Sequence, residues 1–399
     1  MGIISTDNKF KKHWTLDPDV VFLNHGSFGA CPKQVLSAQS GWRSRLEREP
    51  VRFFVRDLER LLDETRARLG AFVGARGDDL CLLPNTTAGV NTVFRSLPLA
   101  PGDEILTTNH EYNACNNAIN FVADRAGAKV VTAHIPFPID SPEQATEAIL
   151  AAVTPRTRYA LIDWITSQTA LVLPIKEIVD ALRAQGVETF VDAAHAPGMV
   201  DVNIDELGAA FCAGNCHKWM CCPKGSAFLH VRKDLQELIR PLSISHGANS
   251  TRVNRSMFRI EADWTGTADP TAYLTIPAAI DFFDDLLEGG WEELRAHNRA
   301  LVLEGRKLLC NALGIDPPAP EIMIGSIATA PLSDGATTGP ANSPLYSDPL
   351  QDTLMERVGV QAPVIPWPAP PQRVLRISAH LYNSIGEYEI LAGALPGLV

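Results

Sequence analysis

The stretch Pro174–Gly198, PIKEIVDALRAQGVETFVDAAHAPG, decides the fold class. Its first part, Pro174–Gln185, repeats apolar residues at helical spacing, and Gly186 follows where a glycine commonly closes a helix. The next part, Glu188–Asp192, is a short apolar run that predicts a buried strand. Asp192 ends this strand, where it either caps the next segment or points into the ligand crevice beyond the carboxyl ends of a parallel sheet.

The same alternation of apolar runs and helical patterns extends from about Val20 to Val231. It predicts an α/β fold with a mostly parallel sheet covered by helices on both faces, in a large domain of residues 20–270. The expected strands are Asp79–Leu83, Glu104–Thr107, Lys129–Ala133, Tyr159–Asp163, Glu188–Asp192 and Ser226–Val231.

The pattern changes after Pro270. Residues 271–399 predict a smaller C-terminal α+β domain, and residues 1–19 are expected to pack on it. The expected helices are Thr271–Leu287, Trp291–Leu313, Pro349–Val358 and Ile385–Leu395, and the expected strands lie near Ile322–Ala328 and Arg373–Ser378. Between them, Pro331–Pro349 is rich in Ser, Gly, Pro, Thr and Asp and predicts a long exposed loop.

Composition narrows the functional classes. The 399 residues are 46% hydrophobic and carry 35 basic and 46 acidic side chains, a net charge of −11. This balance argues against a general nucleic-acid-binding surface. No apolar run approaches the roughly 18 residues of a membrane span, and MGIISTDNKFKKHW lacks the apolar core of a signal peptide. We therefore expect a cytoplasmic protein with neither nucleic-acid nor membrane partners.

Eight cysteines are present, at positions 31, 81, 115, 212, 216, 221, 222 and 310. Without an export signal, disulfides are not expected. Cys212 and Cys216 fit zinc-ligand spacing only loosely and lack a second well-spaced pair, so we predict no metal. The cysteines from 212 to 222 bracket Lys218 and are instead expected to line the pocket of a cofactor.

Three features predict that cofactor. Lys218 lies in FCAGNCHKW, a low-charge stretch; it is either an ordinary surface lysine or a desolvated amine able to form an imine with a carbonyl. The stretch Asn85–Gly89, NTTAG, precedes a helical pattern and suits a phosphate. With Asp192 holding a pyridine nitrogen protonated, these groups meet the needs of pyridoxal 5′-phosphate. No dinucleotide motif opens the sheet, and neither a P-loop nor G-x-S-x-G occurs.

The chain resembles the class V (fold-type I) pyridoxal-phosphate enzymes, and within them the isopenicillin N epimerase family. The resemblance extends from FLNHGSFGACP (22–32) to VLRISAHLYN (374–383). Its landmarks in between are NTTAGVN (85–91), HEYNA (110–114), LVLP (171–174), VDAAHAPG (191–198), HKW (217–219) and WTGTADP (264–270).

The resemblance implies a role for each matching residue. Lys218 would bind the cofactor covalently, Asp192 would pair with the pyridine nitrogen, and Tyr112 would stack on the ring as a further catalytic group. His195 would hydrogen-bond the phenolic oxygen, and Ser167 would lie near it. The phosphate would be held by Thr86, Thr87, Asn215, His217 and, across a homodimer with shared active sites, Thr267 of the neighbouring subunit. Asn24, His25 and Arg376 would bind the substrate, a small amino acid or peptide-like molecule, with Arg376 on its α-carboxylate.

The reaction outcome stays open. We expect an epimerase that removes the Cα proton, with a C–S lyase or class V aminotransferase as alternatives; a non-enzymatic binding protein is disfavoured by Lys218, Asp192 and Arg376. The acid opposite Lys218 could be His25, Tyr112 or His246. Relatives usually carry Ser-Gly where this chain has Asn215-Cys216. No cysteine follows Cys310, which disfavours persulfide-forming desulfurase chemistry. Arg52 and Arg56 either bind a second substrate carboxylate or lie exposed on a helix.

Overall fold

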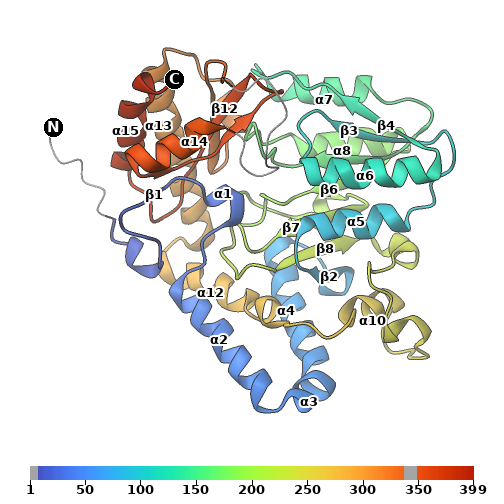
Figure 1. Cartoon of the computed structure of the whole chain (residues 1–399). Coiled ribbons are helices and arrows are strands. Elements are labelled where there is room, and N and C mark those ends of the chain that lie inside the picture. The colour runs from blue at the N-terminus through green and yellow to red at the C-terminus, as the bar shows by residue number, and fades with distance from the viewer. Residues whose placement is uncertain (1–7, 337–347) are drawn as a thin grey trace.

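A seven-stranded sheet forms the centre of the molecule (Figure 1). The structure is a computed structural model that describes residues 8–336 and 348–399. The strands lie in the order β2–β8–β7–β6–β5–β3–β4, with β8 antiparallel to both neighbours and the remaining neighbours parallel. This confirms the mostly parallel α/β fold. The strands are β2 Leu80–Leu83, β3 Glu104–Thr108, β4 Lys129–Ala133, β5 Thr157–Asp163, β6 Glu188–Asp192, β7 Phe211–Asn215 and β8 Ala227–Val231.

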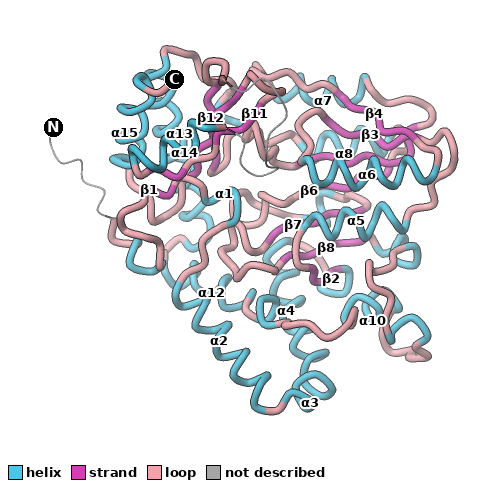
Figure 2. Tube along the Cα trace, in the orientation of Figure 1, coloured by secondary structure: helices cyan, strands magenta, loops and turns pink. Residues whose placement is uncertain are grey.

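Alternate side chains of the sheet enter two separate hydrophobic cores, because successive strand residues point to opposite faces. Phe190 packs in one core with Val93 of α5 and Ile119 of α6. Its neighbour Val191 packs in the other with Ile178 of α8. Figure 2 shows α5 and α6 side by side along the sheet. The helices of this region are α4 Leu58–Val73, α5 Thr86–Ser96, α6 Asn113–Ala126, α7 Pro142–Ala151, α8 Ile175–Ala184, α9 Ile204–Leu207 and α10 Met257–Asp263.

The C-terminal part combines a three-stranded antiparallel sheet with helices, and lies at the upper left of Figure 1. Its strands are β9 Ile327–Pro331, β11 Val364–Pro366 and β12 Arg373–Ser378, and its helices are α13 Gly290–Leu313, α14 Pro349–Thr353 and α15 Ile385–Ala394. None of the described helices has both the length and the apolar character needed to cross a bilayer.

The N-terminal segment lies against this C-terminal part. The Trp14 and Tyr382 rings pack edge to face, with centroids 5.1 Å apart, and Asn8 Nδ2 donates to the Asn383 carbonyl. Strand β1 Val21–Phe22 also pairs with β10 Val360–Gln361, although it falls within the expected large domain. The division of the chain at residue 270 therefore stays a prediction. The remaining N-terminal helices are α1 His25–Phe28, α2 Lys33–Arg48 and α3 Pro50–Arg52.

Several expected elements differ in the structure. Residues 271–287 form α11 Thr271–Leu274 and α12 Ile276–Leu286 instead of one helix, with Pro277 in the first turn of α12, where a missing N–H costs little. The strand expected at Ile322–Ala328 begins only at Ile327, since Glu321–Met323 is a 3₁₀ turn. Strand β7 was not expected. Most of the loop expected between Pro331 and Pro349 lies outside the described residues.

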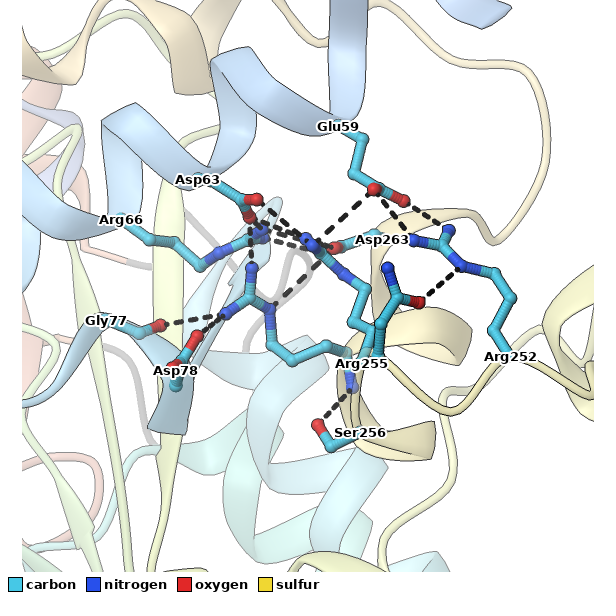
Figure 3. Close-up of polar contacts among 11 residues, drawn as sticks. Glu59, Asp63, Arg66, Gly77, Asp78, Arg252, Arg255, Ser256 and Asp263 are labelled. Carbon is cyan, nitrogen blue, oxygen red and sulfur yellow. Dashed lines mark hydrogen bonds and ion pairs between the residues drawn. The ribbon is translucent and has the colours of Figure 1, made fainter.

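An ion-pair network attaches α4 to the segment that leads into α10 (Figure 3). Arg66 of α4, whose side chain is 1% exposed, binds Asp63 and Asp263. Arg255 binds the same two carboxylates, at 2.5 and 2.7 Å, and Arg259 binds Asp63 as well. Each buried guanidinium group of this network thus has at least one carboxylate partner.

Candidate active site

Residues from widely separated elements meet around a cavity of about 250 Å³ at the carboxyl ends of β5 and β6. The predicted residues that line it are Thr86, Thr87, Tyr112, Ser167, Asp192, His195, Asn215, His217 and Lys218. A larger cavity, of about 430 Å³, lies elsewhere, between Trp14, Arg43 and Lys224, and contains none of the predicted site residues. The smaller cavity is therefore the candidate active site.

Lys218 stands on the loop between β7 and β8. The loop is closed at its base, where Cys216 N and His217 N both donate to the Ser226 carbonyl, at 3.0 and 3.1 Å. Gly29, with a φ of 70°, presses on it so closely that a Cβ there would lie 2.2 Å from the His217 carbonyl oxygen. The position of Lys218 is thus fixed by backbone contacts.

The Lys218 amine lies 3.0 Å from His195 Nε2. Because the Trp219 indole N–H can only donate, its 3.2 Å contact makes His195 Nδ1 an acceptor. Burial holds the pKa of His195 well below its usual value, so the ring is neutral and carries its hydrogen on Nε2. Burial, with a smaller effect of Arg376, also lowers the pKa of Lys218 to about 8. A substantial fraction of Lys218 is therefore a neutral amine near neutral pH.

Asp192 shares the bottom of the cavity with other acidic groups. It accepts hydrogen bonds from Ala194 N, at 2.8 Å, and from the Cys115 thiol, at 3.4 Å. Asp163 lies beside it in register on β5, and Glu111 is buried close by. Sequence reasoning missed Cys115, Glu111 and Asp163, although Asp163 ends a predicted strand as Asp192 does.

The N-terminus of α5 provides polar groups at the other side of the cavity. Asn85 caps the helix by accepting from Ala88 N, and Asn215 Oδ1 accepts from Thr86 N at 3.0 Å. The Thr86 hydroxyl is buried without a hydrogen-bond partner among the described residues. His217 Nδ1 donates to the Ser226 carbonyl at 2.8 Å, and burial lowers the pKa of His217 to about 4. Of these groups, the Thr86 hydroxyl is left available to a ligand, and both Thr86 and His217 line the cavity.

Arg376 of β12 is a buried cation at the edge of this site, 4% exposed. Its guanidinium donates to the Ser167 carbonyl, at 2.5 Å, and to the hydroxyl of Ser27, at 2.9 Å; a longer contact, 3.5 Å, reaches Asn24 Oδ1. No carboxylate of the described chain pairs with it. Ser27 was missed by sequence reasoning, and it also lines the cavity. Such a fixed, uncompensated guanidinium suits a carboxylate ligand.

Five predicted residues lie elsewhere. His25 is fully buried behind Lys218, with Nδ1 2.7 Å from the Tyr382 hydroxyl and Nε2 3.0 Å from the Lys218 carbonyl, and does not line the cavity. His246 lines a different depression, with Trp264. Thr267 is exposed outside the cavity of its own chain. Arg52 and Arg56 are exposed as well. Of the three candidates for an acid opposite Lys218, Tyr112 alone lines the cavity.

The cysteines from 212 to 222 were expected to line the pocket of the cofactor, but they lie elsewhere. Cys212, Cys216, Cys221 and Cys222 are all fully buried in a hydrophobic core and do not line the cavity. Cys221 lies within 4.8 Å of ring nitrogens of His25 and His380. Those two rings stack with planes 18° apart. The buried cysteines therefore have a packing role.

The chain is similar to several known proteins. The model of the family "Aminotransferase class-V" matches residues 31–317. Isopenicillin N epimerase of Streptomyces clavuligerus is 34% identical over 96% of both chains. Putative L-cysteine desulfhydrase 2 of Oryza sativa subsp. japonica is 33% identical over 96% of this chain and 85% of that protein. A solved structure of the cystine C–S lyase C-DES with its product cysteine persulfide has a TM-score of 0.78 and 20% identity, over 96% of this chain and 98% of that one.

Proposed function

The chain belongs to the aminotransferase class-V family, and from this premise we propose that it is a pyridoxal 5′-phosphate enzyme that epimerises an amino acid. One observation carries the proposal. The Lys218 amine and the Tyr112 phenol line the same cavity, and the buried Arg376 guanidinium beside it has no carboxylate partner in the described chain.

The polar groups of the cavity fit this cofactor. Thr86 keeps a buried hydroxyl, without a partner in the described parts of the chain, at a helix N-terminus, where a phosphate is favoured. At the opposite end, Asp192 would hold the ring nitrogen. Thr87, Asn215 and His217 complete the phosphate set, and the negative charge of a phosphate would raise the pKa of His217 and favour its protonation. Between these ends of the cavity, His195 Nε2–H would donate a hydrogen bond to the phenolic oxygen of the cofactor.

When bound, pyridoxal 5′-phosphate supplies an electron sink for negative charge at the Cα of an amino acid joined to it. Arg376 binds the α-carboxylate and so orients Cα, helped by Asn24 and Ser167 that hold the guanidinium. Lys218 comes from the loop after β7, whereas Tyr112 comes from the loop after β3, with β6 and β5 between those strands. A proton removed by one of these groups and returned by the other inverts Cα.

A second candidate is a C–S lyase, since relatives named L-cysteine desulfhydrase cover nearly the whole chain at 33% and 30% identity. In that reaction the Tyr112 phenol would protonate the leaving sulfur. An aminotransferase would instead need the proton to return to the cofactor.

We propose that two copies of the chain share their sites, with Thr267 reaching the phosphate of the neighbouring subunit. Two observations support this: Thr267 is exposed outside its own cavity, and apolar side chains at the cavity mouth are open, with Phe28 57% and Tyr112 43% exposed. Thr267→Val should weaken cofactor binding, and mixing it with Lys218→Ala should restore part of the activity through hybrid dimers. Failure of such mixtures to gain activity would contradict shared sites.

The reaction is tested by incubating the cofactor-loaded protein with single amino acids, aminoadipyl compounds included, in deuterated water. Deuterium at Cα with inverted configuration supports the epimerase, release of pyruvate and ammonia the lyase, and keto-acid-dependent amino transfer the aminotransferase. Borohydride reduction followed by mass spectrometry should place the cofactor on Lys218. Unchanged configuration without Cα exchange for every compound would overturn the epimerase proposal.

A further inference from the structure

Three carboxyl groups are buried together beside the cavity, and two of them, Asp163 and Asp192, line it. Glu111 is 2% exposed, and Asp163 and Asp192 are each 3% exposed. Asp163 and Asp192 are register partners on the parallel strands β5 and β6, so their backbones run only about 4.8 Å apart. Single ligand atoms of Glu111, Cys115 and Asp192 lie within 4.8 Å of one another. We refer to Glu111, Asp163 and Asp192 as the carboxyl cluster.

The members of the carboxyl cluster differ in their hydrogen bonds. Both oxygens of Asp192 accept a bond, from Ala194 N and from the Cys115 thiol. Glu111 accepts one bond, from Tyr112 N at 3.0 Å, and its other oxygen has no partner in the described chain. Asp163 likewise keeps Oδ2 buried and unpartnered within those residues. An ionised carboxylate with such an unpartnered oxygen is costly, whereas an uncharged acid is tolerated more easily.

Glu104 is a buried carboxylate with the partners that a charged group needs, and it can be compared with the carboxyl cluster. It lies at the other end of β3 and is 3% exposed. It accepts from Thr154, Thr157 and Arg156, and the Thr154 hydrogen bond, aided by Arg156, lowers its pKa. No arginine or lysine makes an ion pair with Glu111 or Asp163 in the part of the chain that the structure describes.

Few positive charges face the carboxyl cluster. Lys218, from the β7–β8 loop, and Arg376, from β12, are the nearby cations, and their contacts are with His195 and with Ser167 and Ser27. The remaining titratable neighbours are uncharged: Cys115 and Tyr112, both on α6 or its cap, and the neutral ring of His195. Two nearby cations that are held elsewhere do not balance three adjacent carboxylates.

We propose that Glu111 and Asp163 are positioning residues that stay uncharged in the folded protein, leaving Asp192 as the one carboxylate that faces the ring nitrogen of the cofactor. The role of Asp192 toward the cofactor rests on the proposed function, whereas the uncharged state of Glu111 and Asp163 does not. Burial, and after it the charge of Asp192, raises the pKa of Asp163, and burial with Asp163 and Asp192 does the same for Glu111. Burial raises the pKa of Asp192 too, but the hydrogen bonds from Ala194 N and the Cys115 thiol and the charge of Lys218 oppose this rise. Neutral acids next to Asp192 leave its charge unopposed by like charges, which favours pairing with a cation.

The proposal fixes the sign of a pH effect. A carboxyl group whose pKa is raised by folding stabilises the fold fully only below its unfolded pKa, about 4. As pH rises toward the folded pKa, the ratio of folded to unfolded protein falls by up to about tenfold per pH unit for each such group. Glu111→Gln and Asp163→Asn mimic the uncharged acids and should remove part of this fall.

Infrared spectroscopy of the full-length, cofactor-free protein at about neutral pH tests the charge directly. Wild type minus Glu111→Gln, and wild type minus Asp163→Asn, should each show the C=O band of an uncharged carboxylic acid. Wild type minus Glu104→Gln, the matched control, should show carboxylate bands. Carboxylate bands for Glu111 and Asp163 would overturn the proposal. So would thermal unfolding curves in which both variants follow the wild-type pH dependence between about pH 5 and 9.

Cofactor titration monitored by absorbance tests the role of Asp192. Asp192→Asn should weaken binding by about 10- to 100-fold, the value of a charge-assisted hydrogen bond, while Glu111→Gln should weaken it far less. Equal losses in the two variants would overturn the positioning role. An Asp192→Asn protein that binds as tightly as wild type would contradict the proposed function, whereas the infrared result would still decide the charge of Glu111 and Asp163.

Discussion

The ion-pair network between α4 and α10 and the carboxyl cluster of the cavity are two solutions to burying charge. In the network, Asp63 pairs with Arg66 and Arg255 (Figure 3). Arg259 binds the same carboxylate. Burial alone would raise the pKa of Asp63, but hydrogen bonds from Arg255 and Arg66 outweigh it and lower the pKa to about 2. In the cluster, burial and neighbouring carboxyl groups raise the pKa of Glu111.

The two regions also differ in how their polar groups are partnered. In the network, the Nε atoms of the three guanidinium groups lack hydrogen-bond partners among the described residues, yet each group binds carboxylates. Around the cavity, whole functional groups stand without partners, among them the Thr86 hydroxyl. Since an unsatisfied buried group costs stability, its retention at a cavity indicates a ligand that satisfies it.

Lys218→Ala is expected to show the largest difference between its effect on activity and its effect on stability. Exchange of the Cα proton should fall by at least about 100-fold, because the amine that moves it is gone. The free energy of unfolding of the cofactor-free protein should change by less than about 1 kcal/mol, as expected outside a structural network. Deuterium incorporation and urea unfolding measure the two effects. A large loss of stability in Lys218→Ala would contradict the expected difference between the cavity and the ion-pair network.

Arg66→Met should instead reduce stability strongly. Removing this buried cation leaves Asp63 and Asp263 with fewer partners and should lower the free energy of unfolding by about 3–5 kcal/mol. The control is Arg60→Met, because Arg60 forms an exposed pair with Glu64 and should cost less than about 1 kcal/mol. Urea unfolding of both variants measures the two changes in the free energy of unfolding. Similar values for both would mean that burial adds nothing to the network.

The pH dependence of cofactor attachment probes the cavity alone. Below a pKa of about 8, the fraction of neutral Lys218 amine falls about tenfold per pH unit, so the attachment rate should fall with it. Stopped-flow absorbance measures this rate. Arg376→Met removes a charge that lowers the pKa of Lys218, so its profile should move to higher pH. A shift to lower pH would contradict this electrostatic assignment.

The smallest expected effect concerns a single hydroxyl. Thr86→Val should leave stability nearly unchanged, because the hydroxyl has no partner among the described residues, but should weaken cofactor binding by about 10-fold. Thr107→Val is the matched control, since its hydroxyl is also buried without a partner in that part of the chain but does not line the cavity. Fluorescence titration should separate the two variants. Equal affinities would argue against phosphate contact by Thr86.

Much of the fold follows from local pattern, and the failures have physical causes. The strands of the sheet appear within one or two residues of the expected bounds, because short apolar runs between helical patterns are a strong signal. Strand β7 was missed because FCAGN is short and rich in small residues. The strand near residue 322 was misplaced because apolar Ile322 and Met323 belong to a turn instead.

The site was predicted unevenly. Residues within quoted motifs, such as Asp192 and Lys218, meet at one cavity. Glu111 and Cys115 escaped notice because their chemistry depends on neighbours that only the folded chain brings close. His25 belongs to a quoted motif, yet it lies behind Lys218 and not in the cavity, since sequence spacing says nothing of side-chain direction.

The closed base of the Lys218 loop has a kinetic consequence. Hydrogen bonds to Ser226 and the close approach of Gly29 fix the loop before any ligand arrives. A loop already ordered has little conformational freedom left to lose on association. The first, non-covalent binding of the cofactor should therefore have a rate that rises linearly with cofactor concentration, without the plateau of a slow loop rearrangement. Covalent attachment to Lys218 follows as a separate step.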